Sequence, residues 1–105
     1  MNSMHKLVVL ALVTLLLSSL SVLAQDDVPE IVNVPGTIQP ELGCPGEWAP
    51  ECEATFLEYV EEYDIWERTF ESLPAGSYEY KVALDGGWDE NYGVDGVAGG
   101  DNIVL

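Results

Sequence analysis

The residues best suited to bind a ligand lie between positions 73 and 93, in the segment LPAGSYEYKVALDGGWDENYG. A Pro-Gly turn leads into an alternating strand that contains Lys81, and a loop opened by glycines then presents Trp88, Asn91 and Tyr92. An indole ring can cover the apolar face of a pyranose, while an ammonium and a carboxamide can hydrogen-bond its hydroxyls. This combination of residue types predicts a sugar-binding surface.

Each of these side chains also has a purely structural interpretation. Trp88 can fill space within the fold, and Lys81 can pair with Glu79 or Asp89 in a surface salt bridge of small value. Asn91 can be a turn residue that hydrogen-bonds the neighbouring backbone. The residue types alone leave both interpretations open.

Residues 1–24 have the pattern of a secretory signal peptide. Lys6 supplies a basic start, the apolar run LVVLALVTLLL follows, and Val22 and Ala24 stand where a signal peptidase inspects the chain. The run is too short for a comfortable membrane span. We therefore expect cleavage after Ala24, a secreted (extracellular or periplasmic) protein, and no attachment to a membrane once the signal is removed. The alternative is that the segment stays uncleaved and anchors the chain.

The expected mature chain, residues 25–105, has room for one domain. It holds all nineteen acidic residues against only Arg68 and Lys81, a net charge of −17. Such a surface repels phosphates, so nucleic acid and anionic lipid are excluded as partners. All ten aromatic residues also lie in this part, which argues for a packed core rather than disorder.

Two cysteines, Cys44 and Cys52, flank the segment PGEWAPE. In an exported chain, a pair this close across a Pro- and Gly-rich loop predicts a disulfide. The bridge would stiffen the loop that contains Trp48, a residue that can equally pack against its own disulfide.

No metal or other cofactor is expected. The mature chain has no histidine and no third cysteine, which disfavours a zinc site. A Gly-rich loop with several acids suggests calcium as an alternative, but the spacing fits no EF-hand. The acids in question are Asp85, Asp89, Glu90, Asp95 and Asp101.

Catalysis is not expected either. Paired carboxylates can hydrolyse glycosides, but they need a cleft that 81 residues do not readily supply. Without a histidine in the mature chain, a nucleophilic triad is excluded.

The chain reads as short strands separated by turns, which predicts an all-β protein. Along residues 77–84, Tyr78, Tyr80, Val82 and Leu84 alternate with Lys81 and its neighbours, so that the lysine faces away from the core. A Pro-Gly pair within the first strand favours an edge position or a bulge, and Trp66 is expected in the core. The expected strands are 31–38, 54–60, 65–70, 77–84 and the last, apparently incomplete one, 102–105.

From about residue 31 to residue 105 the sequence resembles the accessory module that precedes the catalytic domain of bacterial pullulanases and amylopullulanases. The matching segments are VPGTIQPELGCPGEWAPEC, the W-x-x-T-F of residues 66–70, LPAGSYEYKVAL, GGWDENYG and DNI. The pattern is more distantly similar to starch-binding modules of amylases and glucoamylases. The resemblance implies an antiparallel immunoglobulin-like β-sandwich, truncated at its C-terminal strand, and an α-glucan ligand.

In starch-binding modules two tryptophans form a stacking platform while a lysine and an asparagine bond the sugar hydroxyls. By motif, the resemblance assigns these roles to Trp48, Trp88, Lys81 and Asn91. The cysteine-closed insert between Gly43 and Trp48 departs from the simple starch-binding pattern, which makes the placement of Trp48 a matter for the structure.

The sequence thus predicts a secreted, non-catalytic, α-glucan-binding module of a pullulanase-type glycoside hydrolase, with a downstream catalytic domain as its partner. The alternative is a structural module that braces a neighbouring domain and binds no sugar. The exposure of the two predicted platform tryptophans discriminates between them.

Overall fold

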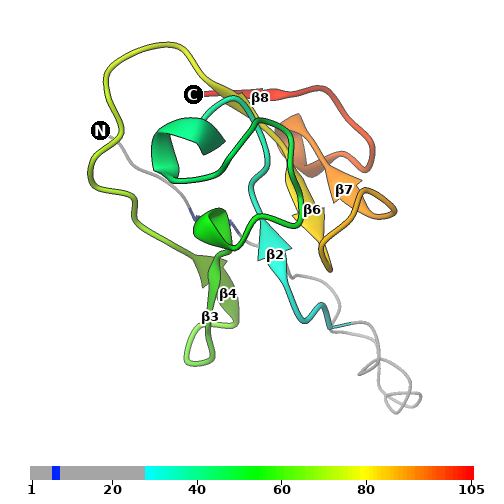
Figure 1. The fold of residues 1–105 in the computed structure, drawn as a ribbon. Helices are drawn as coiled ribbons and strands as arrows, with labels where there is room; N and C mark the ends of the chain where they lie inside the picture. Colours follow the sequence, from blue (N-terminus) through cyan, green and yellow to red (C-terminus); the bar gives the residue numbers. More distant parts are fainter. Residues whose placement is uncertain (1–5, 8–27) are drawn as a thin grey trace, which may run out of the picture.

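A computed structural model describes residues 6–7 and 28–105 (Figure 1). Among these residues all regular structure is antiparallel strand or short 3-10 turn, so the chain is an all-β protein, as predicted. The strands form three sheets with the orders β1-β4-β3, β2-β6-β7 and β5-β8.

The strands are short. They are β1 (Lys6–Leu7), β2 (Val32–Asn33), β3 (Glu58–Val60), β4 (Ile65–Glu67), β5 (Glu79–Tyr80), β6 (Val82–Leu84), β7 (Asn91–Tyr92) and β8 (Ile103–Val104). The 3-10 turns are η4 (Gln39–Leu42), η5 (Glu53–Thr55) and η6 (Val94–Gly96).

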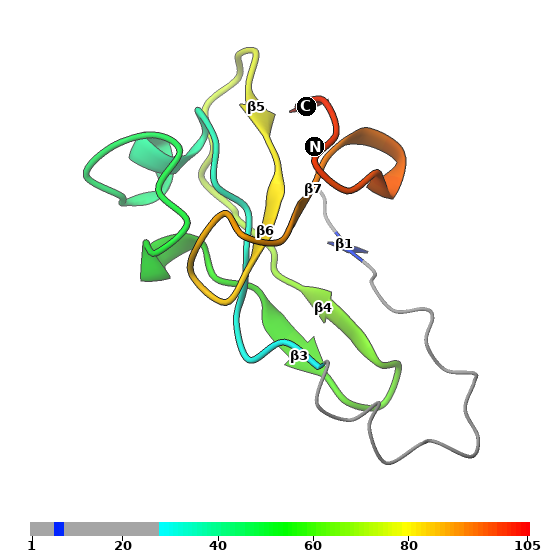
Figure 2. The ribbon, with the colours of Figure 1, turned by 90° about the vertical axis from the view of Figure 1, so that its right-hand side faces the viewer.

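The sheet β2-β6-β7 forms the centre of the fold and has two different faces (Figures 1 and 2). Val32 lies opposite Leu84, so the apolar residues of β2 and β6 share one face. On that face the core is built from the buried side chains of Val32, Val34, Ile38, Leu57 and Val82. The other face is covered by the segment between residues 39 and 55, which lies beside β2 in both views.

The predicted alternation along residues 77–84 is confirmed. Tyr78, Tyr80 and Leu84 pack against the buried core, and Val82 belongs to it. Lys81 falls between β5 and β6, where the chain leaves one sheet and enters the other. Its backbone N–H donates to the carbonyl oxygen of Pro35 at 2.9 Å, so the chain stays anchored at this change of sheet.

Several strand boundaries differ from expectation. The expected strand at 54–60 begins only at Glu58, because η5 occupies residues 53–55. The strand at 65–70 ends at Glu67, and the guanidinium of the following residue, Arg68, donates to the carbonyl oxygen of Phe56 at 2.7 Å. Residues 91–92, expected within a loop, pair with β6 as β7. The edge position of β2 is confirmed.

Trp66 is half-buried rather than fully enclosed. It packs against the core and also against Tyr59 across the β3–β4 hairpin, with ring centroids 5.2 Å apart and planes inclined at 48°. The expectation of a core tryptophan therefore holds only for part of its surface.

The predicted signal peptide, residues 1–24, lies almost wholly outside the described residues. The exception is Lys6–Leu7, which forms β1 and pairs with Glu67 and Trp66 of β4. No helix within the described part of the chain is long and apolar enough to cross a membrane.

Candidate carbohydrate-binding site

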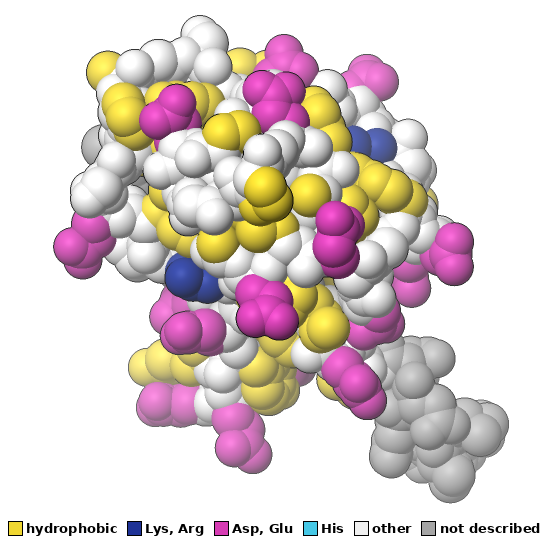
Figure 3. All heavy atoms as spheres, viewed as in Figure 1, with side chains coloured by type: hydrophobic (Ala, Val, Ile, Leu, Met, Phe, Trp, Pro, Cys, Tyr) yellow, Lys and Arg dark blue, Asp and Glu magenta, His cyan; other side chains and the backbone are white. Residues whose placement is uncertain are grey.

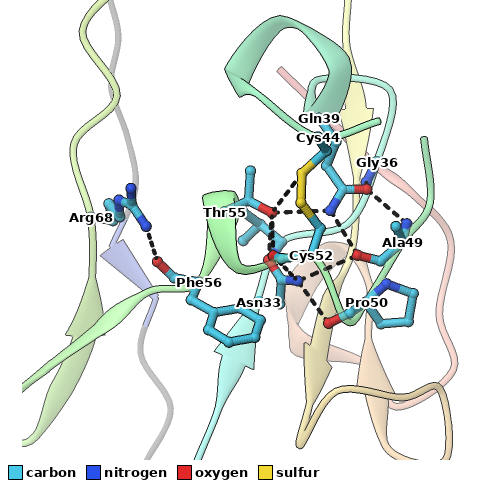
Figure 4. The surroundings of a disulfide bond; sticks show 11 residues. Asn33, Gly36, Gln39, Cys44, Ala49, Pro50, Cys52, Thr55, Phe56 and Arg68 are labelled. Carbon is cyan, nitrogen blue, oxygen red and sulfur yellow. Dashed lines mark hydrogen bonds between the residues drawn. A yellow bond between two sulfur atoms is a disulfide. The ribbon is translucent and has the colours of Figure 1, made fainter. Parts of the chain in front are cut away.

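The disulfide predicted from the sequence is present. Cys44 and Cys52 are bonded, with Cα atoms 6.1 Å apart, and they close the loop that contains Trp48 (Figure 4). Trp48 has a φ of 55°, a left-handed backbone conformation that costs a bulky L-residue on the order of 1–2 kcal/mol. The fold must therefore hold this residue in place, and such strained residues cluster at binding sites.

The loop is held from beneath by a buried polar network of Asn33, Gln39 and Thr55, all fully buried (Figure 4). The Thr55 hydroxyl donates to Asn33 Oδ1 at 2.7 Å and accepts from Gln39 Nε2 at 3.0 Å. Asn33 Nδ2 donates to the carbonyl oxygens of Pro50 at 2.7 Å and Cys52 at 3.1 Å. Because each buried polar group is paired, the network stabilises one loop geometry instead of destabilising the core.

Gly36 brings this loop close to the central sheet. A Cβ atom at Gly36 would lie 2.1 Å from the carbonyl oxygen of Glu79 and 2.5 Å from the Cα of Tyr80, so only glycine fits. The Gly36 carbonyl oxygen accepts a hydrogen bond from the Trp48 N–H at 3.4 Å. The Pro-Gly pair within the first strand thus allows the close approach that places Trp48 beside the strand end.

Trp48 and Trp88 come together in space. Their ring centroids lie 6.4 Å apart with planes inclined at 40°. Trp88 is 39% exposed and Trp48 is partly buried, so neither indole is enclosed in the core. Two partly exposed rings that meet at an angle present apolar surface to solvent.

Asn91 lies on the face of the central sheet that is covered by the segment between residues 39 and 55. It lies opposite Ala83, which in turn lies opposite Asn33, so these residues form one cross-strand row. Asn91 Nδ2 donates to the carbonyl oxygen of Trp88 at 2.9 Å, which is the structural role that the sequence left open for it. Its Oδ1 is buried and accepts no hydrogen bond from the described residues.

Lys81 precedes Ala83 by two residues, between β5 and β6, and it does not belong to the side chains that pack against the core. It is half-buried, and the salt bridge to Glu79 or Asp89 weighed from the sequence does not form among the described residues. Its backbone is tied to Pro35, the neighbour of the Gly36 that holds Trp48. The backbone of Lys81 therefore lies close to the segment that holds the Trp48 loop.

The sequence analysis missed a second aromatic pair on the β3–β4 hairpin. Tyr59 is 44% exposed and stacks on Trp66, while Tyr63 at the turn is 66% exposed. The Tyr59 hydroxyl donates to Asp64 at 2.6 Å, and this hydrogen bond raises the pKa of Tyr59. Alternation would have placed Tyr59 on a strand face, but nothing in the local pattern pairs it with Trp66.

Two further tyrosines have raised pKa values near the central sheet. The hydrogen bond from the Tyr92 hydroxyl to Glu90 is the main cause for Tyr92, and burial is the cause for Tyr80. The acids of the loop after β6 do not converge, and within residues 6–7 and 28–105 no group of three potential ligands lies close enough to hold a metal ion. Figure 3 shows acidic side chains scattered over the visible face instead.

Comparison with known proteins identifies the family. Residues 31–105 match the family described as the pullulanase X25 domain, so the chain belongs to that family and is an accessory module of pullulanases. The match covers β2 to β8 together with the disulfide loop and both tryptophans that meet.

Relatives include amylopullulanases from Thermoanaerobacter thermohydrosulfuricus (38% identical over 81 residues), Thermoanaerobacterium thermosulfurigenes (38% over 83) and Thermoanaerobacterium saccharolyticum (36% over 83). The alignments cover 77–79% of this chain but only 5%, 4% and 6% of the respective relatives. The chain therefore spans about one twentieth of the proteins it resembles. No solved structure matches it.

Proposed function

We propose that this chain is a secreted, non-catalytic module that binds α-glucan, acting with a pullulanase-type glycoside hydrolase. The observation that carries the proposal is the meeting of Trp48 and Trp88, from separate loops, in a partly exposed pair. A buried structural pair would not leave 39% of Trp88 accessible to solvent. Stacking of pyranose rings on this pair is the chemistry that such an arrangement supports.

The polar contacts of the site come from Lys81 and Asn91. The Lys81 ammonium has three donors and no carboxylate partner among the described residues, so it is available to sugar hydroxyls. Asn91 uses one N–H to hold the Trp88 carbonyl, and its second N–H remains for a hydroxyl. Asn91 thus both holds the loop that contains Trp88 and donates a hydrogen bond to the bound sugar.

The α-glucan specificity rests on the family. The relatives are named amylopullulanases, and this chain corresponds to a small fraction of their length. A separate catalytic domain would supply the hydrolysis, and the module would hold that domain on its polysaccharide. Secretion is supported by the signal-like residues 1–24 and by the disulfide, which persists in oxidising compartments.

Titration of tryptophan fluorescence with maltoheptaose tests the proposal. A small, open contact surface implies a dissociation constant on the order of 0.1–1 mM, about −4 to −5.5 kcal/mol. A β-linked glucan oligosaccharide of the same length serves as the control and should bind more weakly. If the folded, disulfide-intact chain shows no response up to saturating maltoheptaose, the glucan proposal is wrong.

The second candidate function is that of a bracing module. The observation in its favour is the β3–β4 hairpin, which projects from the body of the fold (Figure 1) and exposes Tyr59 and Tyr63. Exposed aromatic side chains on a projecting element are suited to a contact with a neighbouring domain. Under this alternative, maltoheptaose produces no signal, and replacing Tyr63, the more exposed of the two, by serine lowers the stability of the longer protein but not that of the chain alone.

A further inference from the structure

Gln39 is a fully buried residue whose side-chain amide is completely used by the protein (Figure 4). Its Oε1 accepts from the backbone N–H of Ala49 at 2.8 Å and of Gly36 at 3.2 Å. Its Nε2 donates to the carbonyl oxygen of Ala49 at 2.8 Å and to Thr55 Oγ1 at 3.0 Å. The amide therefore hydrogen-bonds both the backbone N–H and the backbone carbonyl oxygen of a single residue, Ala49.

Ala49 directly follows Trp48. On its other side, the backbone of Trp48 is held by the long 3.4 Å hydrogen bond to Gly36, and it adopts a left-handed conformation that an unrestrained tryptophan avoids. Gln39 contacts both anchors at once, since it also binds the N–H of Gly36. Asn33 Nδ2 also reaches the Ala49 carbonyl oxygen, at the longer distance of 3.4 Å, but Gln39 makes the shorter hydrogen bonds to Ala49 and binds Gly36 as well.

The disulfide acts on the ends of the loop, which are already held in other ways. The Cys44 N–H donates to the backbone carbonyl oxygen of Gln39 at 3.0 Å, and the Cys52 carbonyl oxygen accepts from Asn33 at 3.1 Å. Neither cysteine is adjacent to Trp48 in the chain. The bridge therefore acts at the two ends of the loop, whereas the hydrogen bonds of Gln39 act next to Trp48.

We propose that Gln39 is the positioning residue for Trp48, and that its paired hydrogen bonds to Ala49, rather than the disulfide, hold the Trp48 ring against Trp88. Only the use of this placement, sugar stacking, rests on the proposed function. The placement itself is a property of the free protein and can be measured without any ligand.

The readout is the electronic coupling between the two indoles. Rings at 6.4 Å with planes inclined at 40° couple their transitions and give paired circular dichroism bands of opposite sign in the far ultraviolet. Trp48→Phe and Trp88→Phe should each remove this couplet and so assign it to the pair. A couplet that survives both substitutions would overturn the proposal, since the pair would then not exist in solution.

Gln39→Met keeps the shape of the side chain and removes all of its hydrogen bonds. We expect the couplet to disappear while the strand signal remains. Thr55→Val is the matched control, because it removes a buried hydroxyl of the same network but keeps the Gln39 pair with Ala49. It should lower the melting temperature and leave the couplet intact. A folded Gln39→Met protein with an intact couplet would overturn the proposal.

The double variant Cys44→Ser/Cys52→Ser tests the role of the bridge. We expect its couplet to be retained, whereas loss of the couplet in a folded double variant would assign the placement to the disulfide and overturn the proposal. If Gln39→Met fails to fold, hydrogen exchange of the native chain decides. The Ala49 amide should stay protected relative to the exposed Glu47 both before and after reduction, and loss of protection on reduction would refute the proposal.

The affinity for maltoheptaose is the one measurement in this experiment that depends on the proposed function. We expect Gln39→Met to weaken binding by about tenfold or more, while the double cysteine variant changes it by less than about threefold. If the native chain binds no maltoheptaose but the couplet behaves as expected, the sugar proposal fails and the positioning role of Gln39 stands. The two proposals therefore fail separately.

Discussion

Asn33 and Asn91 flank Ala83 in a single cross-strand row, and each amide donates to a loop that contains a tryptophan. Asn33 Nδ2 binds the Pro50 carbonyl oxygen in the disulfide loop, and Asn91 Nδ2 binds the Trp88 carbonyl oxygen in the loop after β6. Because the row belongs to the central sheet, both loops are hydrogen-bonded to side chains of the same sheet. This arrangement brings Trp48 and Trp88 together although their loops are distant in sequence.

Replacing Asn91 by alanine should disturb the Trp88 loop. The loss of the hydrogen bond to the Trp88 carbonyl oxygen corresponds to about 1 kcal/mol, and we expect maltoheptaose affinity to fall by about fivefold. Asn102→Ala is the matched control, because Asn102 donates at the surface to Glu79 instead. Equal affinities for the two variants in a fluorescence titration would argue against a role for Asn91 in the site.

Trp88→Ala should abolish detectable binding of maltoheptaose. The ring is the more exposed member of the pair and provides most of the apolar surface open to a sugar. Isothermal calorimetry is the suitable measurement here, because the substitution removes the fluorescent reporter itself. Tyr63→Ala, which removes the more exposed aromatic ring of the β3–β4 hairpin, should leave affinity unchanged. The opposite pattern would move the binding surface to the hairpin.

Lys81→Ala should weaken binding by roughly 1 kcal/mol, about fivefold, the value of one hydrogen bond from a charged donor at a wet site. Stability should change little, because Lys81 forms no ion pair among the described residues. Lys81→Arg retains the charge and the apolar stem and should recover part of the affinity. An affinity for Lys81→Ala equal to that of the native chain would remove this residue from the site.

Removing the disulfide should lower the free energy of unfolding by roughly 2–3 kcal/mol, since the bridge restricts the unfolded chain. Chemical denaturation of Cys44→Ser/Cys52→Ser measures this difference. The native protein, denatured without reductant, should contain no free thiol, as the bonded pair requires. Two titratable thiols would contradict both the bridge and the expected loss.

Stability should decline at alkaline pH because of Tyr80. Burial raises the pKa of its phenol above 10.0, the value it has in the unfolded chain. Its stabilising contribution is therefore complete below pH 10 and is lost as the pH rises through the folded-state pKa. Tyr80→Phe should flatten the fall of the melting temperature above pH 10, even if it lowers the melting temperature at neutral pH. An unchanged alkaline slope in this variant would exclude Tyr80 as the cause.

Features that depend on neighbouring residues could be predicted from the amino-acid sequence. The short spacing of Cys44 and Cys52 predicted their bond, and the alternation around Tyr80 and Val82 predicted which side chains reach the core. The all-β class followed from short strands and frequent turns. The motif resemblance also selected Trp48 and Trp88 as a pair, and the structure brings their rings together.

How those rings are held depends instead on contacts between distant segments of the chain. Asn33, Gln39 and Thr55 are polar residues, yet all three are fully buried beneath the disulfide loop. Their burial is favourable only because each finds partners from distant segments, and no local pattern encodes such partners. The change of sheet at Lys81 and the pairing of β7 likewise depend on long-range backbone hydrogen bonds, which the sequence near them does not specify.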